Sequence, residues 1–171
     1  MPDLFPTAHF HVATEWRLDT PVKDAWNAIL LYRDWPTWWR GFRGVQLLRE
    51  GDDRGVGTVL RQQWRSRLPY TLTFDLEISG VERLQRLEGR ATGDVDGTAT
   101  WTFEEHDGWT IVRFALDVRP ARWWMRLPVP FARQVFAWNF RTVMDRGHEG
   151  LAGLLSVAMI GDTVPMQGAA A

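Results

Sequence analysis

Hydrophobic and polar residues alternate from His9 to Leu18, as they do in a strand with one buried face. One face carries Phe10, Val12, Thr14, Trp16 and Leu18, and the other carries His9, His11, Glu15 and Arg17. A period of two with a single apolar face predicts a half-buried β-strand.

Two helices are predicted after this strand. The first has an apolar stripe at helical spacing, formed by Val22, Ala25, Trp26, Ile29 and Leu30. We expect Thr20 to cap this helix and Pro21 to occupy its first position, where a missing N–H costs nothing. A second, short helix is predicted over Asp34 to Arg40, ended by Gly41 and Gly44.

Six strands and a long helix are predicted in the rest of the chain. The strands are Val45 to Arg49, Thr58 to Arg67, Tyr70 to Ser79, Leu84 to Gly93, Thr98 to Glu105 and Trp109 to Arg119. Their connections are of hairpin length, which makes the sheet antiparallel. The helix, about Phe131 to Leu155, has the apolar stripe Phe136, Phe140, Val143, Gly147, Leu151 and Leu154. This order predicts an α+β fold in which a curved seven-stranded antiparallel sheet surrounds the long C-terminal helix.

Length and composition limit the remaining possibilities. With 171 residues we expect one domain over residues 9–156, a flexible segment over 1–8 and a disordered tail over 157–171. The chain has no cysteine and a formal net charge of −1, which excludes disulfides and argues against nucleic-acid binding. Residues 1–8 do not resemble a signal peptide, and no stretch approaches the ~20 apolar residues of a membrane span. We therefore expect a cytoplasmic protein.

In this order of elements the chain resembles the SRPBCC or START-like superfamily, and in particular its polyketide cyclase/dehydrase-like members. Four stretches carry the resemblance: Thr20 to Trp26; Asp34-Trp35-Pro36-Thr37-Trp38-Trp39, which is similar to the family's W-P-x-W turn; Gly55-Val56-Gly57-Thr58; and Trp138-Asn139, Met144, Gly147 and Gly150-Leu151. The resemblance covers Phe10 to Leu155 and implies a helix-grip fold with a cavity for a hydrophobic ligand between the sheet and the last helix. Because this superfamily holds carriers, receptors and enzymes on one scaffold, the resemblance does not fix the activity.

The apolar strand faces predict the wall of such a cavity. The candidate ligand-binding residues are Gln62, Trp64, Tyr70, Phe74, Trp101, Phe114, Phe136 and Asn139. Eleven tryptophans in a chain of this size indicate either an aromatic core or an aromatic-lined cavity. The row Leu87, Gly89, Ala91 and Gly93 is expected to face inward, where its small residues leave open volume or allow the last helix to approach closely.

The strand from Thr58 to Arg67 has two possible orientations. In the first, Leu60, Gln62 and Trp64 face the cavity while Arg61 and Arg65 face solvent. The reverse orientation places both arginines in the cavity, ready for an anionic or poly-carbonyl ligand. We favour the first because it buries Trp64.

The sequence contains no recognisable catalytic motif. None of its three serines lies in Gly-x-Ser-x-Gly, and His148-Glu149 lacks the second histidine of a His-Glu-x-x-His zinc site. We expect no metal and no cofactor. Tyr70 is the one inward group suited to donate a proton, since a phenol with a pKa near ~10 stays neutral.

Three functions remain open. The first is binding of a small hydrophobic ligand (lipid, quinone or aromatic, polyketide-like). The second is a cyclase or dehydratase, motivated by the resemblance, since orienting a reactive chain requires few catalytic groups. The third is a membrane-associating lipid shuttle, in which Trp123 and Trp124, among Arg122, Arg126 and Arg133, make transient membrane contact. The same segment could instead be a lid over the cavity.

Overall fold

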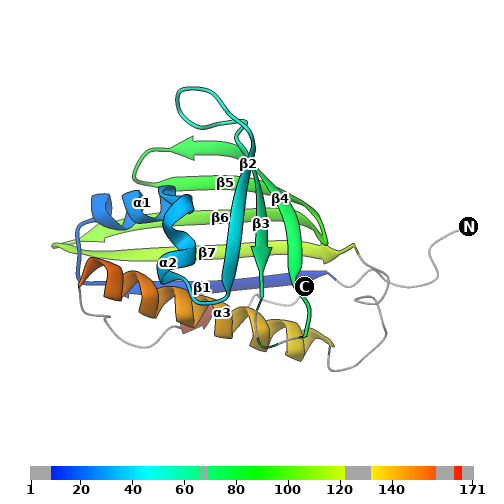
Figure 1. Ribbon diagram of the computed structural model, residues 1–171. Helices are drawn as coiled ribbons and strands as arrows, with labels where there is room; N and C mark the ends of the chain where they lie inside the picture. Colours follow the sequence, from blue (N-terminus) through cyan, green and yellow to red (C-terminus); the bar gives the residue numbers. More distant parts are fainter. Residues whose placement is uncertain (1–8, 66, 68, 122–131, 157–163, 167–171) are drawn as a thin grey trace, which may run out of the picture.

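An antiparallel sheet curves around the long helix α3 in the computed structural model, which describes residues 9–65, 67, 69–121, 132–156 and 164–166 (Figure 1). The elements in chain order are β1 (Phe10–Leu18), α1 (Val22–Leu30), the 3-10 turn η1 (Tyr32–Asp34), α2 (Trp35–Trp38), β2 (Phe42–Arg49), β3 (Val59–Trp64), β4 (Leu72–Glu82), β5 (Arg86–Gly93), β6 (Val95–His106), β7 (Trp109–Pro120), α3 (Ala132–Leu155) and β8 (Val164–Met166). The predicted α+β helix-grip fold is confirmed. None of the described helices is long and apolar enough to cross a membrane.

The sheet has the strand order β2-β3-β4-β5-β6-β7-β1-β8. From β2 to β7 each strand pairs with the next one in the chain, and β1 then pairs with β7, with Phe10 opposite Val118. The seven expected strands are all present. β8 is an addition, which pairs with β1 through Glu15 opposite Val164. β8 falls within the tail that was predicted to be disordered, and the rest of that tail, beyond Ser156, lies outside the described residues.

The two short helices differ from the prediction in detail. Pro21, in extended conformation, occupies the N-cap of α1, and no side chain caps the helix. Thr20 instead places its hydroxyl 3.4 Å from the Asp24 carboxylate, while its carbonyl accepts a 2.7 Å hydrogen bond from the Thr110 hydroxyl. The second helix is a 3-10 turn followed by the four residues of α2.

Trp39 is a fully buried core residue and connects two of the resembling stretches. Its ring is 1% exposed, and its Nε1 donates a 2.8 Å hydrogen bond to the Val143 carbonyl of α3. A Cβ at Gly147 would lie 2.5 Å from this ring, and a Cβ at Gly150 would meet the Trp38 carbonyl. The tryptophans of the W-P-x-W-W stretch thus pack against the glycines of α3.

The outer face of the sheet is charged and held by cross-strand ion pairs. Arg61 on β3 contacts Asp75 on β4 at 2.7 Å, and these two residues are direct register partners. Glu15, 9% exposed, accepts hydrogen bonds from Arg17 at 2.8 Å and from Arg113 at 2.9 Å. The outer face is therefore mostly charged, and most of the apolar side chains of the sheet lie on the concave face.

Candidate ligand cavity

A cavity of about 500 Å³ lies between the concave face of the sheet and α3. Its wall is mostly aliphatic and aromatic, and it is built by side chains from β1, α1, α2, α3 and every strand from β3 to β7. Because period-two alternation sends every second strand residue to the same face, the pattern that forms the core also forms this wall.

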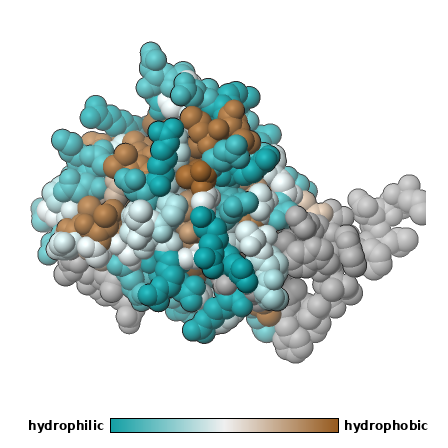
Figure 2. Space-filling model, viewed as in Figure 1, coloured by the Kyte–Doolittle hydropathy of each residue, from teal (hydrophilic) through white to brown (hydrophobic). Residues whose placement is uncertain are grey.

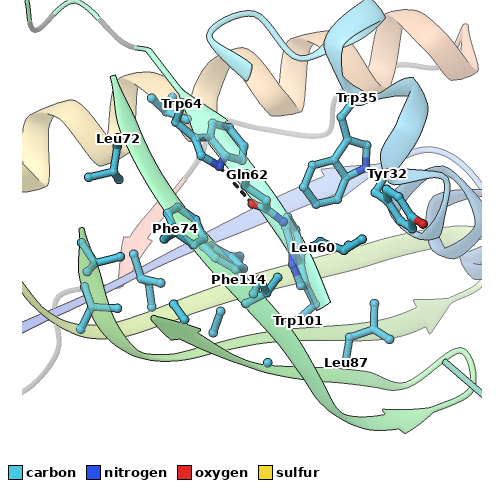
Figure 3. A pocket seen from close by; sticks show the side chains of 18 of the residues that line it. Tyr32, Trp35, Leu60, Gln62, Trp64, Leu72, Phe74, Leu87, Trp101 and Phe114 are labelled. Carbon is cyan, nitrogen blue, oxygen red and sulfur yellow. Dashed lines mark hydrogen bonds between the residues drawn. The ribbon is translucent and has the colours of Figure 1, made fainter. Parts of the chain in front are cut away.

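All eight candidate residues line the cavity. They come from five elements and one connection: Gln62 and Trp64 from β3, Tyr70 from the segment before β4, Phe74 from β4, Trp101 from β6, Phe114 from β7, and Phe136 and Asn139 from α3. Figure 3 shows Gln62, Trp64, Phe74, Trp101 and Phe114 turned toward the same space. Their role in binding a ligand remains a proposal.

The sequence analysis did not predict the wall residues that come from η1, from α2 and from the position that follows α2. Tyr32, Trp35 and Trp39 also line the cavity. Trp35 is 5% exposed and its ring lies 6.3 Å from that of Trp64. The sequence did contain a sign that these residues are buried, because the stretch W-P-x-W-W is too aromatic for a short helix on the surface.

The orientation of β3 is the favoured one. Leu60 is 4% exposed and Gln62 is 3% exposed, and both line the cavity. Arg61 pairs with Asp75 outside, and Arg65 is exposed. The alternative with two arginines in the cavity is therefore wrong.

The row of small residues on β5 faces the cavity only in part. Leu87, Gly89 and Ala91 line it as expected. A Cβ at Gly89 would lie 2.8 Å from a methyl group of Leu76 on β4, so the close neighbour is a strand and not α3. Gly93 does not contribute to the wall in the described part of the chain, and its φ of 134° marks the bend at the end of β5. Glu88, expected on the outside, also lines the cavity, and it pairs with Gly80 just beyond a register shift between Ile78 and Gly80.

Gln62 provides the most deeply buried polar group of the wall. Its Oε1 accepts a 3.0 Å hydrogen bond from Trp64 Nε1, drawn as a dashed line in Figure 3. Its Nε2 is buried and has no hydrogen-bond acceptor among the described residues. A buried donor of this kind is uncommon in folded proteins.

Asn139 and Tyr70 add two further polar groups. Asn139 Oδ1 is buried and finds no donor within the described part of the chain. Burial raises the pKa of the Tyr70 phenol above its usual value of 10.0, and the negative charge of Asp94 raises it further. Tyr70 therefore stays neutral at physiological pH and can donate a proton or a hydrogen bond.

The cavity reaches the surface near the loop between β2 and β3. Leu30, at the end of α1, lines the cavity and is 43% exposed, and exposed Arg54 of the loop lines it too. Leu31 and Leu48 are also exposed. On the face seen in Figure 2, hydrophobic residues gather beneath this loop within a largely hydrophilic surface. An apolar ligand would thus meet an apolar rim at this end.

The segment proposed for membrane contact lies mostly outside the described residues. Trp123 and Trp124 lie within residues 122–131, outside the described residues. Membrane association through them stays a prediction.

Solved structures with the same fold cover most of the chain. The Zhui aromatase/cyclase from Streptomyces sp. R1128 has a TM-score of 0.71 at 15% identity, over 87% of this chain and 94% of that one. A START superfamily protein from Mycobacterium smegmatis has a TM-score of 0.70 at 12% identity, over 86% and 99%. The protein TTHA0849 from Thermus thermophilus has a TM-score of 0.66 at 15% identity, over 85% and 99%. At these identities the likeness concerns the fold alone.

Comparison of the sequence with protein families identifies the family of the chain but not its activity. Residues 9–155 match the family model described as polyketide cyclase / dehydrase and lipid transport. A comparison with curated protein sequences gave no significant match.

Proposed function

The chain belongs to the polyketide cyclase/dehydrase and lipid transport family, and from this premise we propose that it binds a lipid, a quinone or an aromatic, polyketide-like molecule between the sheet and α3. The observation that carries the proposal is the apolar cavity of about 500 Å³. Pockets for small organic ligands typically measure roughly 300–1,000 Å³ and combine apolar walls with a few polar groups.

The shape of the wall favours a flat or unsaturated ligand. Trp101 and Phe114 lie with ring centroids 4.4 Å apart on neighbouring strands, and Phe114 stacks on Phe140 of α3 at 6.0 Å. Aromatic faces arranged around one space offer offset and edge-to-face contacts to another ring.

Native mass spectrometry of protein purified from its own host tests this proposal. We expect a defined co-purifying molecule that denaturing extraction releases. The variant Ala99→Phe should lose it, because Ala99 is 8% exposed and lines the cavity, so a phenyl group there occupies ligand volume. Thr98→Phe is the matched control, since Thr98 is the exposed neighbour on the other face of β6. Equal retention of the molecule by both variants would contradict the cavity as its site.

A cyclase or dehydratase activity is the second candidate, and Tyr70 is the observation that favours it. A neutral phenol inside an apolar cavity can protonate an oxygen of a poly-carbonyl substrate held nearby. The test is product analysis with synthetic poly-carbonyl chains. Turnover by the wild type, reduced at least about tenfold in Tyr70→Phe, supports an enzyme. Binding without conversion supports a carrier.

A further inference from the structure

We infer that Gln62 selects ligands by a carbonyl oxygen, with its side-chain N–H group donating a hydrogen bond to that oxygen inside the cavity. The inference rests on the proposed ligand-binding function and deepens it by naming a chemical feature of the ligand. Gln62 is 3% exposed, lines the cavity, and carries a buried Nε2 that has no acceptor among the described residues.

Trp64 fixes which end of the Gln62 amide faces the cavity. An indole N–H can only donate a hydrogen bond, so the group at 3.0 Å from Trp64 Nε1 must be the amide oxygen. Trp64 lies two residues from Gln62 on the same strand, and their side chains therefore share one face. With the oxygen held by Trp64, the amide cannot flip without losing this bond, and its NH₂ group remains directed away from Trp64.

The side chains next to the amide on the sheet offer a water molecule at Nε2 few polar partners. The neighbours of Gln62 on the same face are Leu60 and Trp64 along β3, and its register partners are Val45 on β2 and Phe74 on β4. A buried water usually needs two to four polar partners, and these side chains offer only the indole N–H that Gln62 already uses. An acceptor carried by the ligand itself satisfies the donor without requiring further polar groups.

This arrangement favours ketones, quinones and esters over hydrocarbons of the same shape. A ligand without an acceptor covers Nε2 and leaves it unpaired, whereas a carbonyl oxygen pairs with it. A site built to hydrogen-bond a ligand group discriminates more strongly against its absence than an apolar site does against its presence. We expect a preference of about tenfold or more in affinity, the range typical of a buried neutral hydrogen bond that is left unmade.

The probe pair is 9-fluorenone and fluorene, which share one tricyclic skeleton and differ by a carbonyl group. Their affinities for the full-length protein are measured by equilibrium dialysis. Because the result is a ratio, any retained host molecule competes equally with both probes. The variants are Gln62→Met, which keeps the length of the side chain but removes the donor, and Gln62→Leu as a second apolar replacement. Gln63→Leu is the matched control, since Gln63 is the exposed neighbour on the opposite face.

We expect tighter binding of fluorenone by the wild type and by Gln63→Leu, and near-equal binding of the two probes by both Gln62 variants. Infrared spectroscopy gives an independent measure: the carbonyl stretch of bound fluorenone should lie at lower wavenumber in the wild type than in Gln62→Met. Equal affinities in the wild type, or a preference that persists in both Gln62 variants, would overturn the inference and leave hydrophobic binding intact. If neither probe binds, the proposed function and the inference fail together.

Discussion

The contact between Gly147 and Trp39 supports a quantitative prediction for Gly147→Ala. The new Cβ would lie 2.5, 2.7 and 2.7 Å from three atoms of the Trp39 indole. The ring has little room to move, because its centroid lies 5.0 Å from Trp64, 5.2 Å from Trp35 and 5.4 Å from Trp16. Either α3 moves away from the sheet or the indole shifts and weakens its bond to the Val143 carbonyl.

The cost follows from opposing terms. Overpacking a core by one methyl group costs about 1–3 kcal/mol, and loss of the buried indole hydrogen bond would cost about 1–3 kcal/mol. Replacing glycine by alanine within a helix stabilises the helix by about 1 kcal/mol. When both costs apply, we expect a net destabilisation of roughly 1–5 kcal/mol, which at ~2–4 °C per kcal/mol lowers the Tm by roughly 2–20 °C.

Thermal and urea unfolding of Gly147→Ala and Gly153→Ala would test this reasoning. Gly153 lies on the same helix, is exposed, and has open space where a Cβ would be. Its alanine variant should therefore gain up to about 1 kcal/mol from helix propensity alone. If Gly147→Ala is as stable as Gly153→Ala, the close approach of Trp39 does not constrain this position.

Two buried titratable groups give predictions for pH ranges that begin at different values, and both are measured by urea unfolding as a function of pH. Burial raises the pKa of Glu15, but its bonds to Arg17 and Arg113 outweigh that effect and hold the pKa below the usual 4.5. Glu15 therefore contributes to the free energy of unfolding above pH 4.5, and this contribution is lost as the pH falls further. The variant Glu15→Gln should lose less stability on acidification, and at neutral pH it should be less stable than the wild type by about 1–2 kcal/mol. Burial lowers the pKa of His148 below 6.5, although its hydrogen bond to the Arg17 carbonyl acts in the opposite direction. The free energy of unfolding should therefore begin to decline as the pH falls below 6.5, at a higher pH than the decline due to Glu15. His148→Phe, which can keep the stacking on Trp16, should remove that decline, and an unchanged slope would show that His148 does not titrate on unfolding.

Strict alternation made much of the sheet predictable. From Leu72 to Ile78 in β4, from Ala99 to Phe103 in β6 and from Val112 to Val118 in β7 every second residue is apolar, so these inward faces could be assigned before the strands were paired. The orientation of β3 followed from the same rule, since Trp64 could be buried only together with Gln62. The five candidate residues on strands reach one cavity for this reason, namely Gln62, Trp64, Phe74, Trp101 and Phe114.

Turns and short elements depended on contacts that a linear pattern does not contain. Asp94 to Gly97 has turn composition, yet β6 begins at Val95. Asp94 is 7% exposed, and its carboxylate accepts a 2.9 Å hydrogen bond from the Thr73 amide, so it joins β4 to the start of β6. β8 depends on a partner about 150 residues earlier in the chain, and no local periodicity marks its three residues.

The hydrogen bond between Trp64 and Gln62 could have been predicted from the sequence. Residues two apart on a strand share a face, and an amide oxygen is a natural acceptor for a donor-only indole. What the sequence could not show is that no protein group among the described residues accepts a bond from the other end of the amide, since that requires the positions of all the neighbouring strands.

The strand order also bears on the sequence of folding events. From β2 to β7 all pairings join consecutive strands, so this meander can form by successive hairpins with short loop closures. The β1–β7 pairing joins Phe10 to Val118, across more than a hundred residues, and the chain entropy of that closure is regained only when the contacts form. We therefore expect β1 to join the sheet late, and with it Trp16, whose ring packs against the rings of Trp39 and Trp101. Until then the concave face is open, and a hydrophobic molecule present at that stage could be enclosed as folding is completed.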